Sequence, residues 1–240
     1  MNSLVLAPQF YARCAGVCYL LIIVLGIFGQ IVVRGSLVVM DDPAATVSNI
    51  AEAPLLWRLG IVGDLAMHLL DIPLMVILYL LLRPVHQAIA LMALVFNVVQ
   101  TAVLAANKLT LIIPLLLISN DHTAAAFPAE QINAQIMLLL ETHNYGFGLG
   151  LTFFGFACLG YGYLIVKSGY IPKVFGFLMA LAGFCYLINS FVLMLYAALS
   201  PTVFMLMVFC LVAELSLCLR LLIKGVSLPH WQHALKKLES

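Results

Sequence analysis

Charged side chains are scarce in this sequence. Only 9% of its 240 residues are Asp, Glu, Lys or Arg, whereas 65% are hydrophobic and the mean hydropathy is +1.14. A soluble domain carries roughly 25% charged and 45–50% apolar residues, so the composition excludes an ordinary soluble globular domain. It predicts an integral membrane protein whose main partner is the lipid bilayer. The formal net charge of +1 provides no electrostatic attraction for nucleic acid, and we expect no such partner.

Cysteine is absent from the polar loops. The six cysteines all lie in apolar stretches: Cys14, Cys18, Cys158, Cys185, Cys210 and Cys218. A disulfide framework is therefore not expected, and the thiols are interpreted as small hydrophobic side chains. Cys14 and Cys18 share a helix face, but no further Cys or His follows at metal-ligand spacing. The sequence identifies no cofactor.

Apolar residues gather in six stretches, each long enough to cross the ~30 Å hydrocarbon core of a bilayer as a helix. Turn-forming and charged residues separate them, as in RPVH (83–86), NDHTAAAFPAE (120–130), KSGYIPK (167–173) and SP (200–201). The sequence therefore predicts an all-α integral membrane protein with a single six-helix transmembrane domain over residues 1–240. The predicted spans cover approximately residues 14–33, 55–82, 88–119, 142–166, 174–199 and 202–223.

Lys and Arg residues are distributed unequally between the two ends of these spans. Most fall at the end that carries both termini: Arg13, Arg83, Lys167, Lys173, Arg220, Lys224, Lys236 and Lys237. Only Arg34 and Arg58 flank the opposite end. Because cytoplasmic loops are enriched in Lys and Arg, we predict that both termini are cytoplasmic.

Two short segments have the character of helices at the membrane surface. Residues 41–54 (DDPAATVSNIAEAP) begin with Asp42, a good helix cap, followed by Pro43 at the first helical position, so we predict a short outer interfacial helix. The C-terminal segment SLPHWQHALKKLES combines Trp231 and Leu235 with Lys236 and Lys237, which favours the inner interface.

Two polar stripes interrupt the apolar spans. Asp64, His68 and Asp71 in the second span are spaced i, i+4, i+7 and therefore share one face of a helix. The third span has a matching face that carries Asn97, Gln100, Thr101 and Lys108. The short RPVH turn makes these two helices antiparallel neighbours, so the stripes are expected to face each other.

The stripes are expected to lie at matching depths, given a rise of ~1.5 Å per residue. We predict Asp71 level with Asn97, His68 opposite Gln100 and Thr101, and Lys108 within reach of Asp64. Later spans add Asn189 and Glu214 to the same layer, with Glu141 and His143 at its outer rim. The pattern predicts a buried polar cavity between the second, third and sixth spans.

The charges of this layer are unequal. Asp64, Asp71 and Glu214 supply three negative charges, against Lys108 and at most one more from His68. An unpaired charge in a low-dielectric medium is costly. At least one carboxyl is therefore expected to hold a proton, or the cavity to hold a cation or water.

Two other interpretations of the polar layer remain open. Lys108 and Asp64 could form a buried ion pair with purely structural value, with the amides and His68 hydrogen-bonding between helices. Alternatively, Asp64 and His68 could bind a metal ion, with Glu214 or His143 completing the ligand set.

Several motifs resemble those of bacterial membrane proteins grouped as domain of unknown function family 4386. They are ARCAGVCYLLIIVLGIFG, DDPAATVSNI, DIPLMVILYLLLRPV, GLTFFGFACLGYGYLIVKSGYIPKVFG and AELSLCLRLLIKGV, and the resemblance runs from about Ala12 to Val226. It implies a six-span helical protein of a bacterial cytoplasmic (inner) membrane, and no activity. Segments that resemble the family motifs contain Arg13, Asp42, Thr46, Asn49, Arg58, Asp64, Asp71, Tyr79, Arg83, Asn107, His143 and Glu214. Asn97 stands where the family pattern leads us to expect an arginine.

Three functional classes fit these observations. The first is a protein that handles a small ligand, a proton or a cation in the cavity, with His68, Asp71 and Glu214 exchanging protons. The second is a membrane-embedded enzyme, metal-dependent or not, that acts on a lipid-soluble substrate. The third is a helical scaffold or partner subunit in which the polar layer only fixes helix register.

Overall fold

A computed structural model of the protein describes residues 7–119 and 126–239. In these ranges the chain is helical and has no strand. Six helices are long and apolar enough to cross a membrane, which confirms the predicted all-α, six-span class. They cover Pro8–Leu37, Pro54–Leu82, Gln87–Ser119, Ala129–Ser168, Lys173–Leu195 and Ala197–Lys224. Residues 120–125 of the predicted 120–130 loop lie outside the described residues.

Several of the six spans consist of more than one helical segment. The first comprises α1 (Pro8–Ile27), the π-helical η2 (Phe28–Arg34) and α2 (Gly35–Leu37); the third comprises α5 (Gln87–Asn107) and α6 (Leu109–Ser119). The second, fourth and fifth are the continuous helices α4 (Pro54–Leu82), α8 (Ala129–Ser168) and α9 (Lys173–Leu195). The sixth comprises η3 (Ala197–Leu199), α10 (Ser200–Val203), η4 (Phe204–Leu206), α11 (Met207–Leu219) and η5 (Arg220–Lys224).

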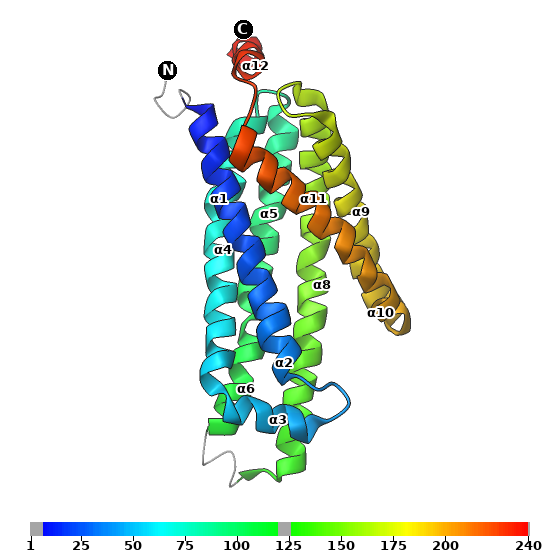
Figure 1. The fold of residues 1–240 in the computed structure, drawn as a ribbon. Helices are drawn as coiled ribbons and strands as arrows, with labels where there is room; N and C mark the ends of the chain where they lie inside the picture. Colours follow the sequence, from blue (N-terminus) through cyan, green and yellow to red (C-terminus); the bar gives the residue numbers. More distant parts are fainter. Residues whose placement is uncertain (1–6, 120–125, 240) are drawn as a thin grey trace.

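Two shorter helices lie outside the spans. Helix α3 (Pro43–Glu52) crosses the end of the bundle opposite the termini, and α12 (Leu228–Glu239) lies at the end that carries both termini (Figure 1). As predicted, Asp42 caps α3, because its Oδ1 accepts a hydrogen bond of 2.9 Å from the Ala45 N–H. Trp231 of α12 is buried and donates from Nε1 to the Leu81 carbonyl oxygen at 3.1 Å. That α3 and α12 lie at the membrane surface stays a prediction. The cytoplasmic location of the two termini also stays a prediction.

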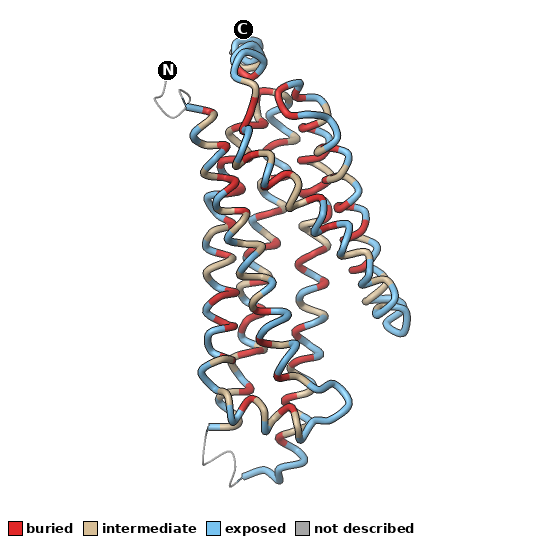
Figure 2. The backbone as a smooth tube through the Cα atoms, in the orientation of Figure 1, coloured by how far each residue is buried: buried red, intermediate tan, exposed pale blue. Residues whose placement is uncertain are grey.

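The outward surface of the spans is apolar. On α4, Val62 is 60% exposed and Leu69 68% exposed, whereas Asp64 and His68 are buried. A soluble protein has the reverse arrangement, so this distribution is that of an integral membrane protein with lipid against the bundle. The first part of the sixth span packs loosely, because no residue of η3, α10 or η4 is buried (Figure 2).

Helices α8 and α9 are the most closely packed pair. A Cβ on Gly162 would lie 2.8 Å from the Gly176 carbonyl oxygen, and one on Gly176 would lie 2.7 Å from the Gly162 carbonyl oxygen. Gly155 and Gly183 repeat this reciprocal contact two turns away. Glycine is needed here because the two backbones touch, a common feature of helix pairs in membranes.

The fourth span begins 13 residues earlier than predicted, at residue 129 rather than 142. Its added segment contains Glu130, Gln131 and Gln135, which lower the hydropathy and hide the helix from a search for apolar runs. Ile132, Ile136 and Leu140 nevertheless recur at every fourth residue and are buried on one face. The first span also extends beyond its predicted limits, whereas the fifth ends at Leu195, four residues before its predicted end.

A polar layer separates two hydrophobic cores. The core at the α3 end contains Val33, Leu37, Ile50, Trp57, Ile61, Leu111, Ile132, Ile136 and Leu140. The larger core, toward α12, includes Leu74 and Leu78 of α4, Ala90 and Ala93 of α5, and Leu164 of α8. Asp64, His68 and Asp71 lie between the two on α4, and the buried polar residues of α5 lie between them on the neighbouring helix. This layer contains the candidate site.

Candidate functional site

The carboxyl of Asp71 lies against α5, opposite the residues that its depth predicts. The Thr101 hydroxyl donates a short hydrogen bond to Asp71 Oδ2, and Asn97 Nδ2 donates to Asp71 Oδ1 at 3.4 Å. All three side chains are buried. Both partners are neutral, so they donate one hydrogen bond to each carboxyl oxygen without balancing a negative charge.

Asp64 has a different environment, seven residues earlier on α4. Its Oδ2 lies 2.9 Å from Lys108 Nζ and 2.7 Å from Arg34 Nη1. Lys108 occupies the break between α5 and α6, and Arg34 ends the π-helical η2. We call Arg34, Asp64 and Lys108 the ion-pair cluster; it carries two positive charges and one negative charge.

Two neighbouring residues support the ion-pair cluster. Gln30 Oε1 accepts a hydrogen bond of 3.0 Å from Arg34 Nε, which fixes the guanidinium. Gly29 lies directly beneath the Asp64 carboxylate, and a Cβ at this position would collide with Asp64 Oδ1. The absence of a side chain at Gly29 therefore lets α4 bring Asp64 against the first span.

Arg34 was missed in the sequence analysis, which placed it only as a flank of the first span. With Arg34 included, the three carboxyls of the polar layer are matched by two fixed positive charges, and by a third only when His68 is protonated. The shortage is concentrated on two residues, because Arg34 and Lys108 both contact Asp64, and neither Asp71 nor Glu214 forms an ion pair with any described residue. The depth of Arg34, about 31 Å along the helix from Arg13, would have been a usable signal.

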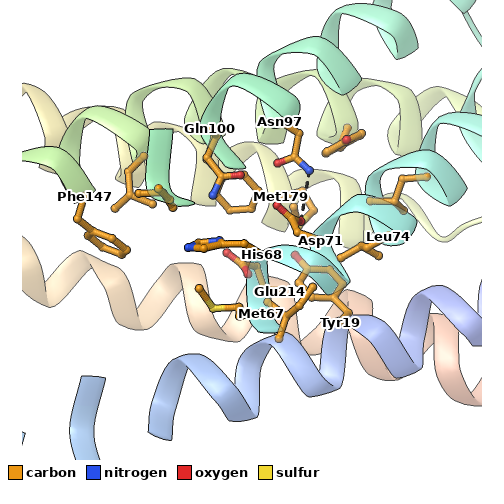
Figure 3. Close-up of a pocket in the computed structure, with 16 residues that line it drawn as sticks. Tyr19, Met67, His68, Asp71, Leu74, Asn97, Gln100, Phe147, Met179 and Glu214 are labelled. Atoms are coloured by element: carbon orange, nitrogen blue, oxygen red, sulfur yellow. Dashed lines mark hydrogen bonds between the residues drawn. The ribbon is translucent and has the colours of Figure 1, made fainter. Parts of the chain in front are cut away.

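Glu214 on α11 approaches the same layer from the opposite side. The Tyr186 hydroxyl of α9 donates a short hydrogen bond to Glu214 Oε1. The Tyr186 ring packs against Phe154 at a centroid distance of 5.2 Å, and Tyr19 of α1 lies beside Glu214 (Figure 3). These tyrosines were not predicted, because an aromatic residue in an apolar span gives no periodic signal of its own.

A cavity of about 140 Å³ lies between these side chains (Figure 3). Its polar wall contains His68, Asp71, Asn97, Gln100, Tyr161 and Glu214. Its apolar wall contains Tyr19, Ile22, Met67, Leu74, Leu78, Leu104, Phe147, Leu151, Phe154 and Met179. The sequence predicted a cavity between α4, α5 and α11; residues of α1, α8 and α9 line it as well.

The remaining predicted site residues lie outside this cavity. Thr101 does not line the cavity, but its hydroxyl is within hydrogen-bond distance of two residues that do, Asp71 and Gln100; Asn189 is buried on α9 but does not line the cavity. His143 is buried, and its carbonyl oxygen accepts a hydrogen bond of 2.9 Å from Asn107 Nδ2. Glu141 is exposed, because two residues along a helix rotate a side chain by about 200°, so it cannot share the inward face of His143.

The geometry does not favour the metal interpretation. Among residues 7–119 and 126–239, no group of three or more His, Cys, Asp or Glu side chains comes close enough to hold a metal ion. Asp64, the first ligand of the predicted set, already contacts Arg34 and Lys108, whose positive charges would repel a cation.

Comparison with known families places the chain among related sequences. The family model described as "Domain of unknown function (DUF4386)" matches residues 14–225. The chain belongs to this family. The match covers nearly all of the DUF4386 bundle described above, from the first span to the end of the sixth. No curated protein and no solved structure matches this DUF4386 member.

Proposed function

We propose that this multi-pass DUF4386 protein binds a small ligand in the cavity, with His68, Asp71 and Glu214 as the groups that contact it and exchange protons with it. The two carboxyls that line the cavity have no cationic partner among the described residues, and this is the observation on which the proposal depends. We further propose a bacterial cytoplasmic membrane as its location, with both termini in the cytoplasm.

The structure around each carboxyl supports a binding role over a purely structural one. A structural buried carboxylate is expected to resemble Asp64, which is packed against two cations and a glycine. Asp71 and Glu214 instead border empty space, where each must hold a proton or receive a counter-charge from something that enters the cavity. Binding sites for small molecules share this combination of apolar walls and a few convergent polar groups.

Occlusion of the cavity tests this proposal. Ile22 of α1 lines the cavity, whereas Val24, two residues further on, is 53% exposed on the outer surface. The Ile22→Phe variant places an aromatic ring at the cavity wall and reduces the volume of the cavity, and the Val24→Phe control adds an aromatic ring on the exposed outer surface. Purified wild-type protein and both variants would be heated with a set of benzene-sized compounds of positive, negative and no charge, because ligands that bind the folded state raise its thermal stability.

We expect at least one compound to stabilise the wild type and Val24→Phe in a saturable manner, and to have no effect on Ile22→Phe. The proposal would be overturned if every stabilising compound acted equally on Ile22→Phe. A complete absence of stabilising compounds, with all three proteins folded, would favour the scaffold interpretation instead.

A further inference from the structure

We infer that the ligand of this cavity is a small organic cation, a primary ammonium group on a compact apolar body of benzene-like size. This inference rests on the proposed function and specifies the ligand class. It follows from three properties of the cavity: the hydrogen-bonding character of its polar wall, its size, and the nature of its rim.

The polar wall is rich in hydrogen-bond acceptors. Asp71 and Glu214 accept hydrogen bonds from neutral hydroxyl and amide donors and have lone pairs to spare. Asn97 is only 2% exposed, yet its Oδ1 has no partner within the described part of the chain. An ammonium group has three N–H donors and no acceptor, so it complements such a wall.

Further unpartnered atoms belong to the same wall. His68 Nε2 and Tyr161 Oη are buried and form no hydrogen bond with the residues that the structure describes. Both side chains line the cavity. Buried polar atoms normally have partners, and several lone ones around a single cavity indicate that a ligand supplies the missing contacts.

The charge of the surroundings favours a cation over an anion. The two basic residues of the polar layer, Arg34 and Lys108, contact Asp64 and do not line the cavity. A negatively charged ligand would therefore meet two carboxyls and no counter-charge. A ligand with one positive charge would offset one carboxylate and would also lie near the aromatic side chains of Tyr19 and Phe154, residue types whose ring faces attract cations.

The size and the rim of the cavity restrict the rest of the ligand. A volume of about 140 Å³ is close to the ~150 Å³ of an engineered protein cavity that holds benzene. Phe147, at the opposite end of the cavity from Leu74, is exposed, and Ile22, Met67 and Phe154 are half-buried (Figure 3). These residues form an apolar rim, which matches a ligand with an apolar body.

Three probes of similar size test the ligand class on the purified full-length protein. Benzylamine carries a positive charge, benzyl alcohol is neutral and benzoate is negative. We expect benzylamine to bind about tenfold or more tightly than benzyl alcohol, and benzoate not to bind, as measured by calorimetric titration. If benzyl alcohol or benzoate bound as tightly as benzylamine, the cation class would be overturned while the cavity remained a binding site.

Two conservative variants test the residues. Asp71→Asn and Glu214→Gln each remove a charge but keep an oxygen for Thr101 or Tyr186 to donate to, so the fold should be retained. Each is expected to weaken benzylamine binding about tenfold. Glu141→Gln removes a carboxylate that is exposed and outside the cavity, and it should leave the affinity unchanged.

The outcomes separate this inference from the proposed function. If Asp71→Asn and Glu214→Gln bound benzylamine like the wild type, the ammonium would not contact the carboxyls, and the inference would be wrong. If none of the three probes bound although other compounds distinguished the wild type from Ile22→Phe, only the cation class would fail. Equal binding of benzylamine to the wild type and Ile22→Phe would count against the cavity itself.

Discussion

Asp64 and Asp71 lie two turns apart on one helix, both buried, and have opposite surroundings. Asp64 contacts two cations and does not line the cavity described above; Asp71 contacts two neutral donors and lines this cavity. Residue type and burial are therefore the same, and only the neighbours differ. Under the proposed function, the comparison teaches that a carboxyl within a membrane span serves as a binding group where the fold provides no counter-charge and leaves a cavity beside it.

The largest difference in stability between Asp64 and Asp71 variants is expected when each aspartate is replaced by asparagine. In Asp64→Asn, the buried Lys108 and the half-buried Arg34 keep their like charges without a carboxylate, which should cost about 3–5 kcal/mol of stability. Thermal or denaturant unfolding of the purified protein measures this loss. If Lys108→Met in the Asp64→Asn background recovers part of the stability, the loss is due to the unbalanced cation; a loss below that of Asp71→Asn would contradict the comparison.

The next effect concerns the glycine beneath Asp64. Gly29→Ala places a methyl group against the carboxylate and should cost about 1–3 kcal/mol through overpacking. Gly26→Ala, one turn earlier, is the matched control, because its new Cβ would meet only Met67 Sδ at 3.4 Å. Equal thermal stability of the two variants would show that Asp64 can move away from the first span without loss.

A smaller effect is expected for the hydroxyl that donates to Asp71. Thr101→Val keeps the shape of the side chain and removes the donor, so stability should fall by about 1 kcal/mol. Thr101→Ser keeps the hydroxyl and provides the control for the hydrogen bond. If both variants unfolded at the same temperature, the interaction between Thr101 and Asp71 would have no net value.

The smallest change in stability is expected for Asp71→Asn itself. The amide can still accept from Thr101, and the variant no longer has a carboxyl without a counter-charge. We expect stability within about 0.5 kcal/mol of the wild type, or above it, together with about tenfold weaker binding of benzylamine. A large destabilisation with retained binding would reverse the roles assigned to the two aspartates.

Sequence periodicity predicted part of the site, because the relative positions of these residues depend on the local geometry of the helices. The i, i+4, i+7 spacing on α4, the short turn after it and a constant helical rise were enough to bring Asp71 level with Asn97 and Thr101, and Lys108 to Asp64. The same reasoning predicted the capped helix α3 and the six spans.

Other parts could not be predicted in this way. The π-helical η2 has more residues per turn than an α-helix. A period of 3.6 residues therefore predicts the wrong direction for the side chain of Arg34, the last residue of η2. Tyr186 and Tyr19 reach Glu214 from two different helices, and their positions depend on how α1, α9 and α11 pack together. Sequence spacing within one helix contains no information about such packing.

The glycine contacts of α8 and α9 restrict how the cavity can change its size. The backbones touch at Gly162 and Gly176 and again two turns away, so this pair is expected to behave as a single stiff wall. Expansion of the cavity to admit a ligand, or contraction around the ligand, would then require movement of the helices on the other side of the cavity. Glu214 belongs to α11, which is one of those helices. Ligand occupancy of the cavity and the tilt of α11 should therefore be mechanically linked.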